Sequence, residues 1–426
     1  MNVYGIEFGN TQTCIATIDK NGYPHIIPNI ADNSNKLACA VFFENADNVV
    51  VGNCAKDMME TDGERVVQFI RSEIGKSNAR TYEFDGKTYT PVEIGSLFLR
   101  RLLQMIEEQG YSKDDVVVTV PSYFGMEETA DIKKMADLSG WNLINVIPEA
   151  TAVTMSYLWN QKDNNLNALV YDLGGGSFDV SLLNSTVTRD SLGMRQQKIL
   201  ITKTSGNHEL GGKDWDDKLF DFILQACCDE NGLTPDEIDV ETRQEIRSKT
   251  ELVKKKLSNI EVTKVRIRVN GELTSVLVRR VDFENLTRNL VECTLRYVDE
   301  ILQDNGTNDI DVVLLAGGST YMPMIRNAIE AKFPGKVKCQ DPDCAAAIGA
   351  TIYGCKLKNL PEPKPLHQKH VDSPYSPKLI ASMIQYAIDH NYDDLAKELI
   401  SEINWNALTD EELFNFFLRI RHVYRI

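Results

Sequence analysis

The sequence of 426 residues lacks several features that would place it in a special class of protein. No window approaches the roughly 18 uninterrupted apolar residues of a membrane-spanning helix. The start, Met1-Asn2-Val3-Tyr4-Gly5, has neither the basic nor the apolar region of a signal peptide. No basic block is present, and 46 Lys and Arg against 62 Asp and Glu give a net charge of −16. These absences predict a cytoplasmic protein whose principal partner is neither nucleic acid nor an anionic membrane surface.

Paired cysteines are also absent. The 9 cysteines are an odd number and show no Cys-x-x-Cys spacing, which favours reduced core thiols over disulfides or a zinc site. A hydrophobic content of 42% and a charged content of 25% exclude disorder as the main state. At about 150 residues per domain, the length predicts two or three domains.

One structural unit occurs twice in the chain. In the first copy, a strand over Val3–Phe8 contains Glu7, runs into a glycine turn and is followed by a strand over Cys14–Ile18. In the second copy, a strand over Ala168–Tyr171 leads through Asp172 into a glycine turn and a strand over 179–183. The two turns are Gly9-Asn10-Thr11-Gln12 and Gly174-Gly175-Gly176-Ser177. Each copy therefore predicts a β-hairpin with an acid beside a glycine turn.

The repeat continues downstream of each hairpin. Both copies predict a buried strand, a helix, a short strand and a second helix. In the first copy these are a strand over 116–120, a helix from 127, a strand over 143–147 and a helix from 149. In the second copy they are a strand over 312–315, a helix over 323–332, a strand near 337 and a helix near 343. The prediction is a duplicated α/β fold with two lobes around a cleft. Lobe I spans 1–165 with an inserted subdomain over about 36–90, and lobe II spans 166–358 with an inserted subdomain over about 204–290.

A different composition follows the second lobe. The prolines of residues 359–376 predict a stiff linker. Residues 377–426 have the apolar spacing of helices, with Ser376-Pro377 as a helix start and Thr409 with Glu412 as a capping box. We expect a small C-terminal helical segment there.

The glycine turns suggest a phosphate site. Backbone amides converge on an anion where no Cβ blocks close approach. The acids Glu7 and Asp172 would repel a polyphosphate unless a cation intervened, and Mg²⁺ bridging the phosphates is the usual solution. The alternative is that both acids are strand-end residues that pair with nearby lysines.

Four segments together resemble the nucleotide-binding domain of the seventy-kilodalton heat-shock chaperones (DnaK-type). They are Gly5-Ile6-Glu7-Phe8-Gly9-Asn10-Thr11, Val118-Thr119-Val120-Pro121-Ser122-Tyr123-Phe124, Asp172 to Asp179, and Leu315-Ala316-Gly317-Gly318-Ser319-Thr320. The resemblance covers about residues 3–358. It implies the actin-like (ribonuclease-H-like) ATPase fold, which actin and the sugar kinases share. The segment from Gly206 to Asp214 and the helix from Glu251 to Ser258 are similar to the chaperones rather than to the kinases.

This resemblance implies ATP or ADP with Mg²⁺ as ligands. Glu7 and Asp172 would hold the metal through its waters. The phosphate-binding residues would be Gly9, Asn10, Thr11, Gln12, Gly174, Gly175, Gly176 and Ser177. The adenosine-binding residues would be Gly212, Glu251, Lys254, Lys255, Ser258, Gly317, Gly318, Ser319, Tyr321 and Asp343. The spacing of 251, 254, 255 and 258 puts these four on one helix face, although a lysine run can also be a solvated face.

The resemblance also implies which residues take part in catalysis and in lobe movement. The resemblance implies Arg71, Glu149, Asp172 and Ser177 as catalytic residues, with Asp172 and Glu149 orienting the attacking water. A glutamate in a first helical turn can instead complement the helix dipole. Pro121 matches a proline that couples nucleotide state to lobe movement, although proline can also merely end a strand.

The sequence departs from the family pattern at several positions. Arg71 stands where the family has a catalytic lysine, and its planar guanidinium would contact phosphate differently. Glu7 is one methylene longer than the usual aspartate, and Mg²⁺ tolerates little distortion. Tyr321 replaces an arginine over the adenine. Asn145 replaces an arginine that contacts J-domain partners in many members.

We expect a Mg-ATP-binding, slowly hydrolysing chaperone-like ATPase without the peptide-binding domain, because the residues after the linker are helical in pattern and too few for a β-sandwich. Nucleotide state would be coupled to the helical tail or to an unidentified protein partner. The alternatives are a nucleotide-binding regulatory or scaffold module with impaired hydrolysis, and an actin-like filament former.

Overall fold

The computed structural model describes residues 2–46, 48–159, 161, 165–189, 195–303, 310–339 and 341–364. The chain forms two compact units, one of Met1–Asp19 with Pro24–Glu362 and one of Lys20–Tyr23 with Pro363–Ile426. In the described part of the second unit, the Lys364 amide donates to the Gly22 carbonyl oxygen at 2.7 Å. The predicted tail helices and most of the predicted linker lie outside the described residues.

The main sheet of lobe I has the strand order β11-β10-β1-β2-β3, with β4 also paired to β2. Strand β1 is antiparallel to β2 and parallel to β10, which is parallel to β11. Every residue of β10 is buried, as its run of valines predicts. The bounds are β1 (Val3–Phe8), β2 (Gln12–Ile18), β3 (Pro24–Ile26), β4 (Leu37–Ala38), β10 (Asp115–Val120) and β11 (Asn142–Pro148).

The main sheet of lobe II repeats this arrangement strand for strand. Its order is β18-β17-β12-β13-β14, with β12 antiparallel to β13 and parallel to β17, and β17 parallel to β18. The bounds are β12 (Leu166–Leu173), β13 (Phe178–Arg189), β14 (Arg195–Asn207), β17 (Val312–Ala316) and β18 (Val337–Lys338). The shared order and strand directions confirm the α/β class and the duplicated, two-lobed fold.

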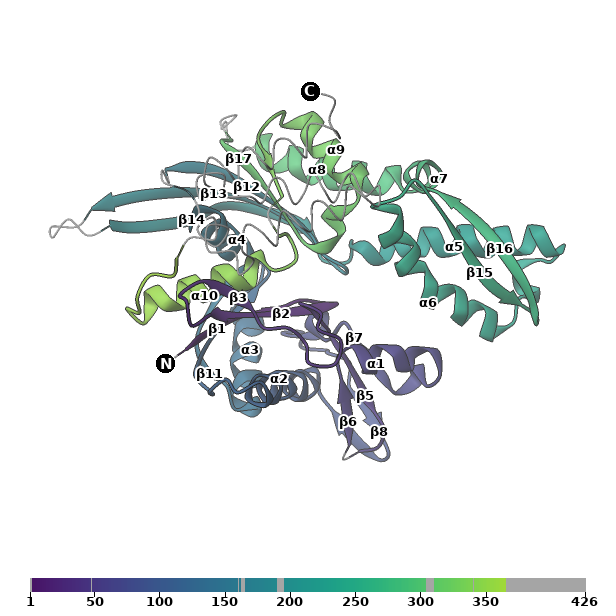
Figure 1. Ribbon diagram of the computed structural model, residues 1–426, viewed down its shortest axis with the longest axis horizontal. Helices are drawn as coiled ribbons and strands as arrows, with labels where there is room; N and C mark the ends of the chain where they lie inside the picture. The colour runs from purple at the N-terminus through teal and green to yellow at the C-terminus, as the bar shows by residue number, and fades with distance from the viewer. Residues whose placement is uncertain are drawn as a thin grey trace, which may run out of the picture. The chain divides into compact units, whose positions relative to one another are not determined.

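Equivalent helices follow equivalent strands. After β10 come α3 (Met126–Ser139) and, beyond β11, α4 (Glu149–Trp159); after β17 come α9 (Pro323–Lys332) and, beyond β18, α10 (Ala345–Leu357). Helices α4 and α10 pack on one another, and α10 also packs on β1, β10 and β2 (Figure 1). A Cβ on Gly349 of α10 would lie 1.8 Å from the Ala152 carbonyl oxygen of α4, so this crossing requires glycine.

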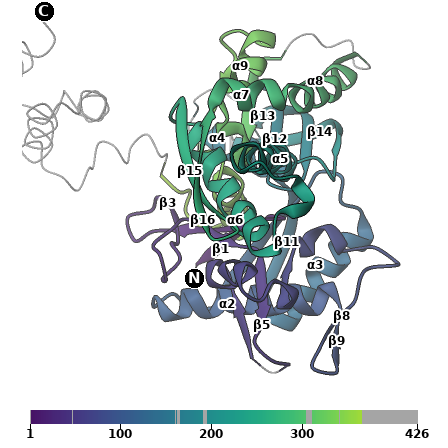
Figure 2. The same cartoon turned by 90° about the vertical axis from the view of Figure 1, so that its right-hand side faces the viewer.

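Each lobe also contains an insertion between its first hairpin strands and its later strands. In lobe I it holds the sheet β6-β5-β7, a hairpin and a short helix; in lobe II it holds two long helices and a hairpin, which lie on the side that faces the viewer in Figure 2. The lobe I elements are β5 (Ala40–Phe43), β6 (Val49–Val51), α1 (Asn53–Asp57), β7 (Val66–Gln68), β8 (Tyr82–Phe84) and β9 (Lys87–Tyr89). The lobe II elements are α5 (Gly212–Asn231), α6 (Val240–Leu257), β15 (Val262–Val269), β16 (Glu272–Arg279) and α7 (Arg280–Leu286).

Each lobe has its own hydrophobic core. The lobe I core lies between its sheet and α2 (Pro91–Glu108), and the lobe II core packs α5, α6 and α8 (Arg288–Gln303) against its strands. Helix α2 begins at a capping box made by Thr90 and Glu93. All 9 cysteines are free thiols, as the sequence predicts, and six of them are buried.

Candidate functional site

The two glycine turns and both predicted acids meet at one cavity of about 790 Å³, which residues from both lobes line. All but two of the predicted site residues line it, the exceptions being Gly212 and Pro121. Gly212 lies directly behind the wall, because a Cβ on it would be 2.5 Å from the Ser319 hydroxyl oxygen. The duplication therefore brings together residues that are far apart in the sequence.

The two glycine turns face each other at close range. A Cβ on Gly175 would lie 2.3 Å from the Thr11 hydroxyl oxygen, and a Cβ on Gly176 would lie 2.5 Å from the Asn10 amide nitrogen. A methyl group at either position would displace the side chain that faces it from the other turn. The chain can therefore present backbone from both hairpins to the same small volume, which is the arrangement that a phosphate group requires.

Arg71 is fixed at the floor of the cavity. It lies in a short 3₁₀ turn, Ile70–Glu73, which follows Phe69 in the left-handed conformation (φ 58°). Its guanidinium is buried and donates three hydrogen bonds, to Glu149 Oε1 at 2.6 Å, to Ser177 Oγ at 3.1 Å and to the Phe8 carbonyl oxygen at 3.2 Å. Burial lowers the pKa of Arg71, but the carboxylates around it, Glu149 foremost, hold it above its usual value. Arg71 is thus a permanent cation bound to residues of both lobes.

Buried carboxyl groups outnumber this cation. Burial and the neighbouring Glu149 raise the pKa of Asp172 to about 7, although Arg71 opposes the shift. Burial, Glu149 and Asp172 raise the pKa of Glu7 well above its usual range, and burial with Asp172 does the same for Asp179. This concentration of acid favours either bound protons or a bound cation.

The acids fit a magnesium ion that is held through water. Glu7 Oε2 and Asp179 Oδ1 are buried and have no hydrogen-bond partner. Among the described residues, no three His, Cys, Asp or Glu side chains converge closely enough to bind a metal directly. Mg²⁺ commonly keeps several waters and uses one or two carboxylates, so the site matches its preferences better than those of a metal with a full protein shell.

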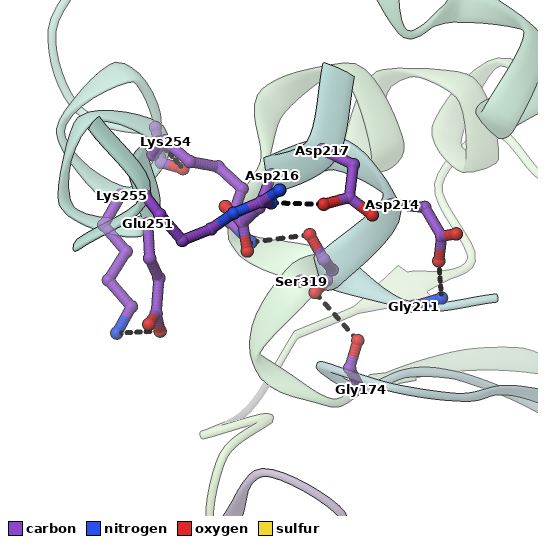
Figure 3. A network of polar contacts seen from close by, with 12 residues as sticks. Gly174, Gly211, Asp214, Asp216, Asp217, Glu251, Lys254, Lys255 and Ser319 are labelled. Atoms are coloured by element: carbon purple, nitrogen blue, oxygen red, sulfur yellow. Dashed lines mark hydrogen bonds and ion pairs between the residues drawn. The ribbon is translucent and has the colours of Figure 1, made fainter. Parts of the chain in front are cut away.

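The lobe II wall of the cavity is a network of polar contacts (Figure 3). Lys254 of α6 donates to the Gly212 carbonyl oxygen and to Asp216, both at 2.8 Å. Ser319 donates to the Gly174 carbonyl oxygen at 2.9 Å. Lys254 therefore ties α6 to α5 through its ammonium group, while Lys255 of α6 and Ser258, the residue directly after that helix, line the cavity.

Two ion pairs across the cavity were not predicted from the sequence. Lys56 of α1 pairs with Glu251 of α6, which also binds Lys255 at 2.8 Å. Burial raises the pKa of Glu251, but Lys56 and Lys255 together lower it to about 2. Lys36 pairs in the same way with Asp343. No local pattern marks either lysine, because the partners are distant in sequence and meet only through the packing of the lobes.

Asp179 was also missed, although a signal was present. It is the cross-strand partner of Asp172 in the β12–β13 hairpin, and the symmetric spacing of the two acids about the glycine turn places both at its base. Pairing the two strands of this hairpin residue by residue from the sequence would have placed Asp172 opposite Asp179.

Pro121 lies outside the cavity, at the end of β10, where the chain turns toward lobe II. The Phe124 amide donates to the Pro121 carbonyl oxygen at 3.1 Å and closes the turn. The Tyr123 ring lies over His208 of lobe II, with 3.4 Å between the ring centroids. Ser181 donates to the Ser122 hydroxyl oxygen at 3.2 Å. The turn that Pro121 begins is therefore one of the contacts between the lobes.

In a comparison with known families, a family model described as Hsp70 protein matches residues 79–372, more than half of the chain. The match includes most of the cavity wall, with Glu149, the second glycine turn, α6 and Asp343. In the described part of the chain, no helix combines the length and the apolar character needed to span a bilayer.

Proposed function

The chain belongs to the Hsp70 family, and from this premise we propose that it binds ATP and ADP with Mg²⁺ in the cavity between its lobes and hydrolyses ATP slowly. Members of the family are generally ATPases that bind nucleotide and protein substrates. The observation that carries the proposal is the opposed pair of glycine turns, with unpartnered carboxylate oxygens beside them.

The nucleotide would lie across both lobes. The turns at Gly9–Gln12 and Gly174–Ser177 would bind the phosphates through backbone amides. Glu251, Lys255, Ser258, Ser319 and Tyr321 would surround the adenosine, and Gly317 and Gly318 would let it approach the backbone. Lys254 would act indirectly, since it already holds Gly212 and Asp216.

The acids would serve the metal and the attacking water. Glu7 and Asp172 would hold Mg²⁺ through its waters, and the ion would supply charge neutralisation at the phosphates. Of the two acids proposed to orient the attacking water, Glu149 is already engaged by Arg71. Asp172 is therefore the more available acceptor of a proton from that water.

Calorimetric titration with ATP and ADP, with and without Mg²⁺, tests the binding proposal, and phosphate release at saturating Mg-ATP tests hydrolysis. We expect Mg²⁺-dependent binding of both nucleotides and slow turnover. Replacing Asp172→Asn should lower turnover by about a hundredfold or more, because the general base is lost. Absence of binding would contradict the nucleotide site. Turnover unaffected by Asp172→Asn would contradict the role of this acid.

A second candidate function has one specific observation in its favour. Arg71 is bound to Glu149, Ser177 and the Phe8 carbonyl group, so it has little freedom to follow a phosphate through a reaction. The protein would then bind ATP as a regulatory or scaffold module with impaired hydrolysis. Tight Mg-ATP binding with phosphate release at background level would favour this function over the first.

Movement of the lobes would carry the nucleotide state to a protein partner. The turn from Pro121 contacts lobe II through Ser122 and Tyr123, and it begins at the end of the strand next to β1. A change at the first glycine turn would therefore pass through β1 and β10 to the contacts that Ser122 and Tyr123 make with lobe II.

A further inference from the structure

Two cysteine thiols lie against each other beside the cavity. Cys14 of β2 and Cys344, the residue before α10, are 330 positions apart in the sequence, yet Cys14 Sγ donates to Cys344 Sγ at 3.0 Å. Their exposed fractions are 3% and 1%. Cys14 also lines the cavity, between the first glycine turn and the hydrophobic cluster in which both cysteines are packed.

The other cysteines do not form an equivalent pair. Cys39 also lies at the first glycine turn, where its Sγ contacts the Thr13 hydroxyl oxygen at 3.0 Å and donates to the Gly9 carbonyl oxygen at 3.1 Å. Among the described residues, the Cys39 sulfur therefore contacts oxygen atoms and not a second thiol. Cys227 and Cys228 are sequence neighbours within α5, and no contact between their sulfur atoms is seen in the described structure.

We propose that Cys14 and Cys344 are a modification site, at which a hydroperoxide that enters the cavity converts the two thiols into a disulfide. The thiolate of Cys14 attacks one peroxide oxygen, the O–O bond breaks, and a sulfenic acid and one molecule of water form. The thiolate of Cys344 then attacks the sulfenic sulfur, the S–O bond breaks, and a second water leaves. In sum, two thiols and one hydrogen peroxide give one disulfide and two waters.

The two thiol sulfurs need to move only a little to form a disulfide bond. The sulfur atoms must approach from 3.0 Å to about 2.05 Å, the length of a disulfide. Both side chains are already packed in one apolar cluster with Ala16, Met155 and Ile348. The approach therefore requires an adjustment of about 1 Å shared between a strand and a helix start.

The bond would tie the first glycine turn to the adenosine side of the cavity. Cys344 directly follows Asp343, and the Gly317 amide of lobe II donates to the Pro342 carbonyl oxygen at 2.9 Å. Cys14 follows the first turn by two residues on β2. The disulfide would thus connect lobe I to the segment that leads out of lobe II. As a consequence that rests on the proposed function, oxidation should slow the exchange of bound nucleotide.

The test treats the full chain with hydrogen peroxide and counts thiols after denaturation. Nine thiols are expected to fall to seven, and peptide mapping should find the Cys14 and Cys344 peptides joined with the loss of two hydrogens. The hydrogen bond to Cys344 and burial both raise the pKa of Cys14, so thiolate is scarce and the reaction should be followed to its end point. Bound Mg-ATP should slow the oxidation, because Cys14 faces the cavity.

Matched variants separate this pair from general oxidation. Cys14→Ser and Cys344→Ser should each give no joined peptide, whereas Cys54→Ser, which removes an exposed cysteine, should still give the joined Cys14 and Cys344 peptides. Thermal unfolding checks that each variant is folded, and either one of the pair suffices for the test. A joined peptide containing any other cysteine, or loss of two thiols from Cys344→Ser, would overturn the proposal. Nucleotide exchange is measured separately, so a protein that oxidises as expected but binds no nucleotide contradicts the proposed function and leaves the thiol pair standing.

Discussion

At the scale of single residues, Arg71 determines how the floor of the cavity is arranged. Its three hydrogen bonds join the end of β1, the start of α4 and the second glycine turn. A lysine in its place would keep the positive charge but would bring a compact ammonium group on a flexible stem. Arg71 therefore holds its charge in a fixed position, whereas a lysine would be more mobile.

We expect Arg71→Lys to raise the rate of phosphate release. The shorter side chain cannot keep all three contacts, so Glu149 becomes free and the positive charge can move toward the phosphates. A group displaced by about 1 Å can change a rate by about a hundredfold, so an increase of between about tenfold and a hundredfold is expected in single-turnover assays. ATP affinity, measured by titration, serves as the control and should change far less. An unchanged or reduced rate would contradict this explanation of slow hydrolysis.

The ion pair of Lys56 with Glu251 should slow nucleotide release, since it connects the two inserted subdomains. Both side chains are partly exposed, so the pair contributes at most about 1 kcal/mol, and Lys56→Gln should speed release by up to about fivefold. Stopped-flow displacement of a fluorescent nucleotide measures the rate. Lys249→Gln is the matched control, because it removes an ion pair with Glu245 and a hydrogen bond to the Arg266 carbonyl oxygen of β15, both within the lobe II insertion. Equal effects of both variants would count against a role for the cross-cavity pair.

At the scale of elements, the facing glycine turns are the most constrained part of the site. The Gly175 Cβ position lies within 3.0 Å of three side-chain atoms of Thr11, whereas a Cβ on Gly174 would be no closer than 3.5 Å to the Ser177 carbonyl oxygen. One turn therefore contains both a position that excludes a methyl group and a position that accepts one.

Gly175→Ala should lower the free energy of unfolding by about 1–3 kcal/mol and weaken ATP binding, because the turns must move apart to admit the methyl group. Gly174→Ala changes the same turn by the same atom and should leave the unfolding free energy close to that of the wild type. Denaturant titration gives the first quantity and calorimetry the second. If both variants unfold alike, the turns are not in the tight contact described.

The hairpins at the site were predictable from the sequence because an acid, a glycine turn and two β-rich runs are local signals. The order of strands and helices along each half of the chain followed once the repeat was recognised. The pairings of Lys36 and Lys56 could not be predicted, since each depends on how the two lobes face one another. Lys254 lies on the cavity wall, but its bonds to Gly212 and Asp216 were not foreseen, because helix periodicity identifies a face and not the partners of that face.

At the scale of the whole molecule, the buried acids make stability depend on pH. Burial raises the pKa values of Glu7, Asp172 and Asp179 above those of an unfolded chain, so the folded protein binds more protons between about pH 4 and 7. Stability from such groups is lost as pH rises through this window. The pKa of Glu251 is lowered to about 2, so its contribution is already complete above about pH 5.

The melting temperature of the ligand-free protein should therefore fall between about pH 5.5 and pH 7.5. Mg-nucleotide should flatten this dependence, because a cation among the acids stabilises their charged forms. Calorimetric scans at fixed ionic strength measure both effects. Glu7→Gln should reduce the slope, since it removes one of the groups. A melting temperature that rises across this window would show that the acids are paired more fully than the contacts indicate.

The backbone contacts of α10 have a consequence for how the lobes move. Gly349 brings α10 against the Ala152 carbonyl group of α4, and Gly5 of β1 brings the sheet of lobe I against the Ala347 carbonyl group on α10. Elements in such close contact cannot swing apart without losing packing over their length. We therefore expect nucleotide-dependent motion to be a shear, in which α4 and α10 slide along each other in small steps, rather than rotation at a single flexible loop.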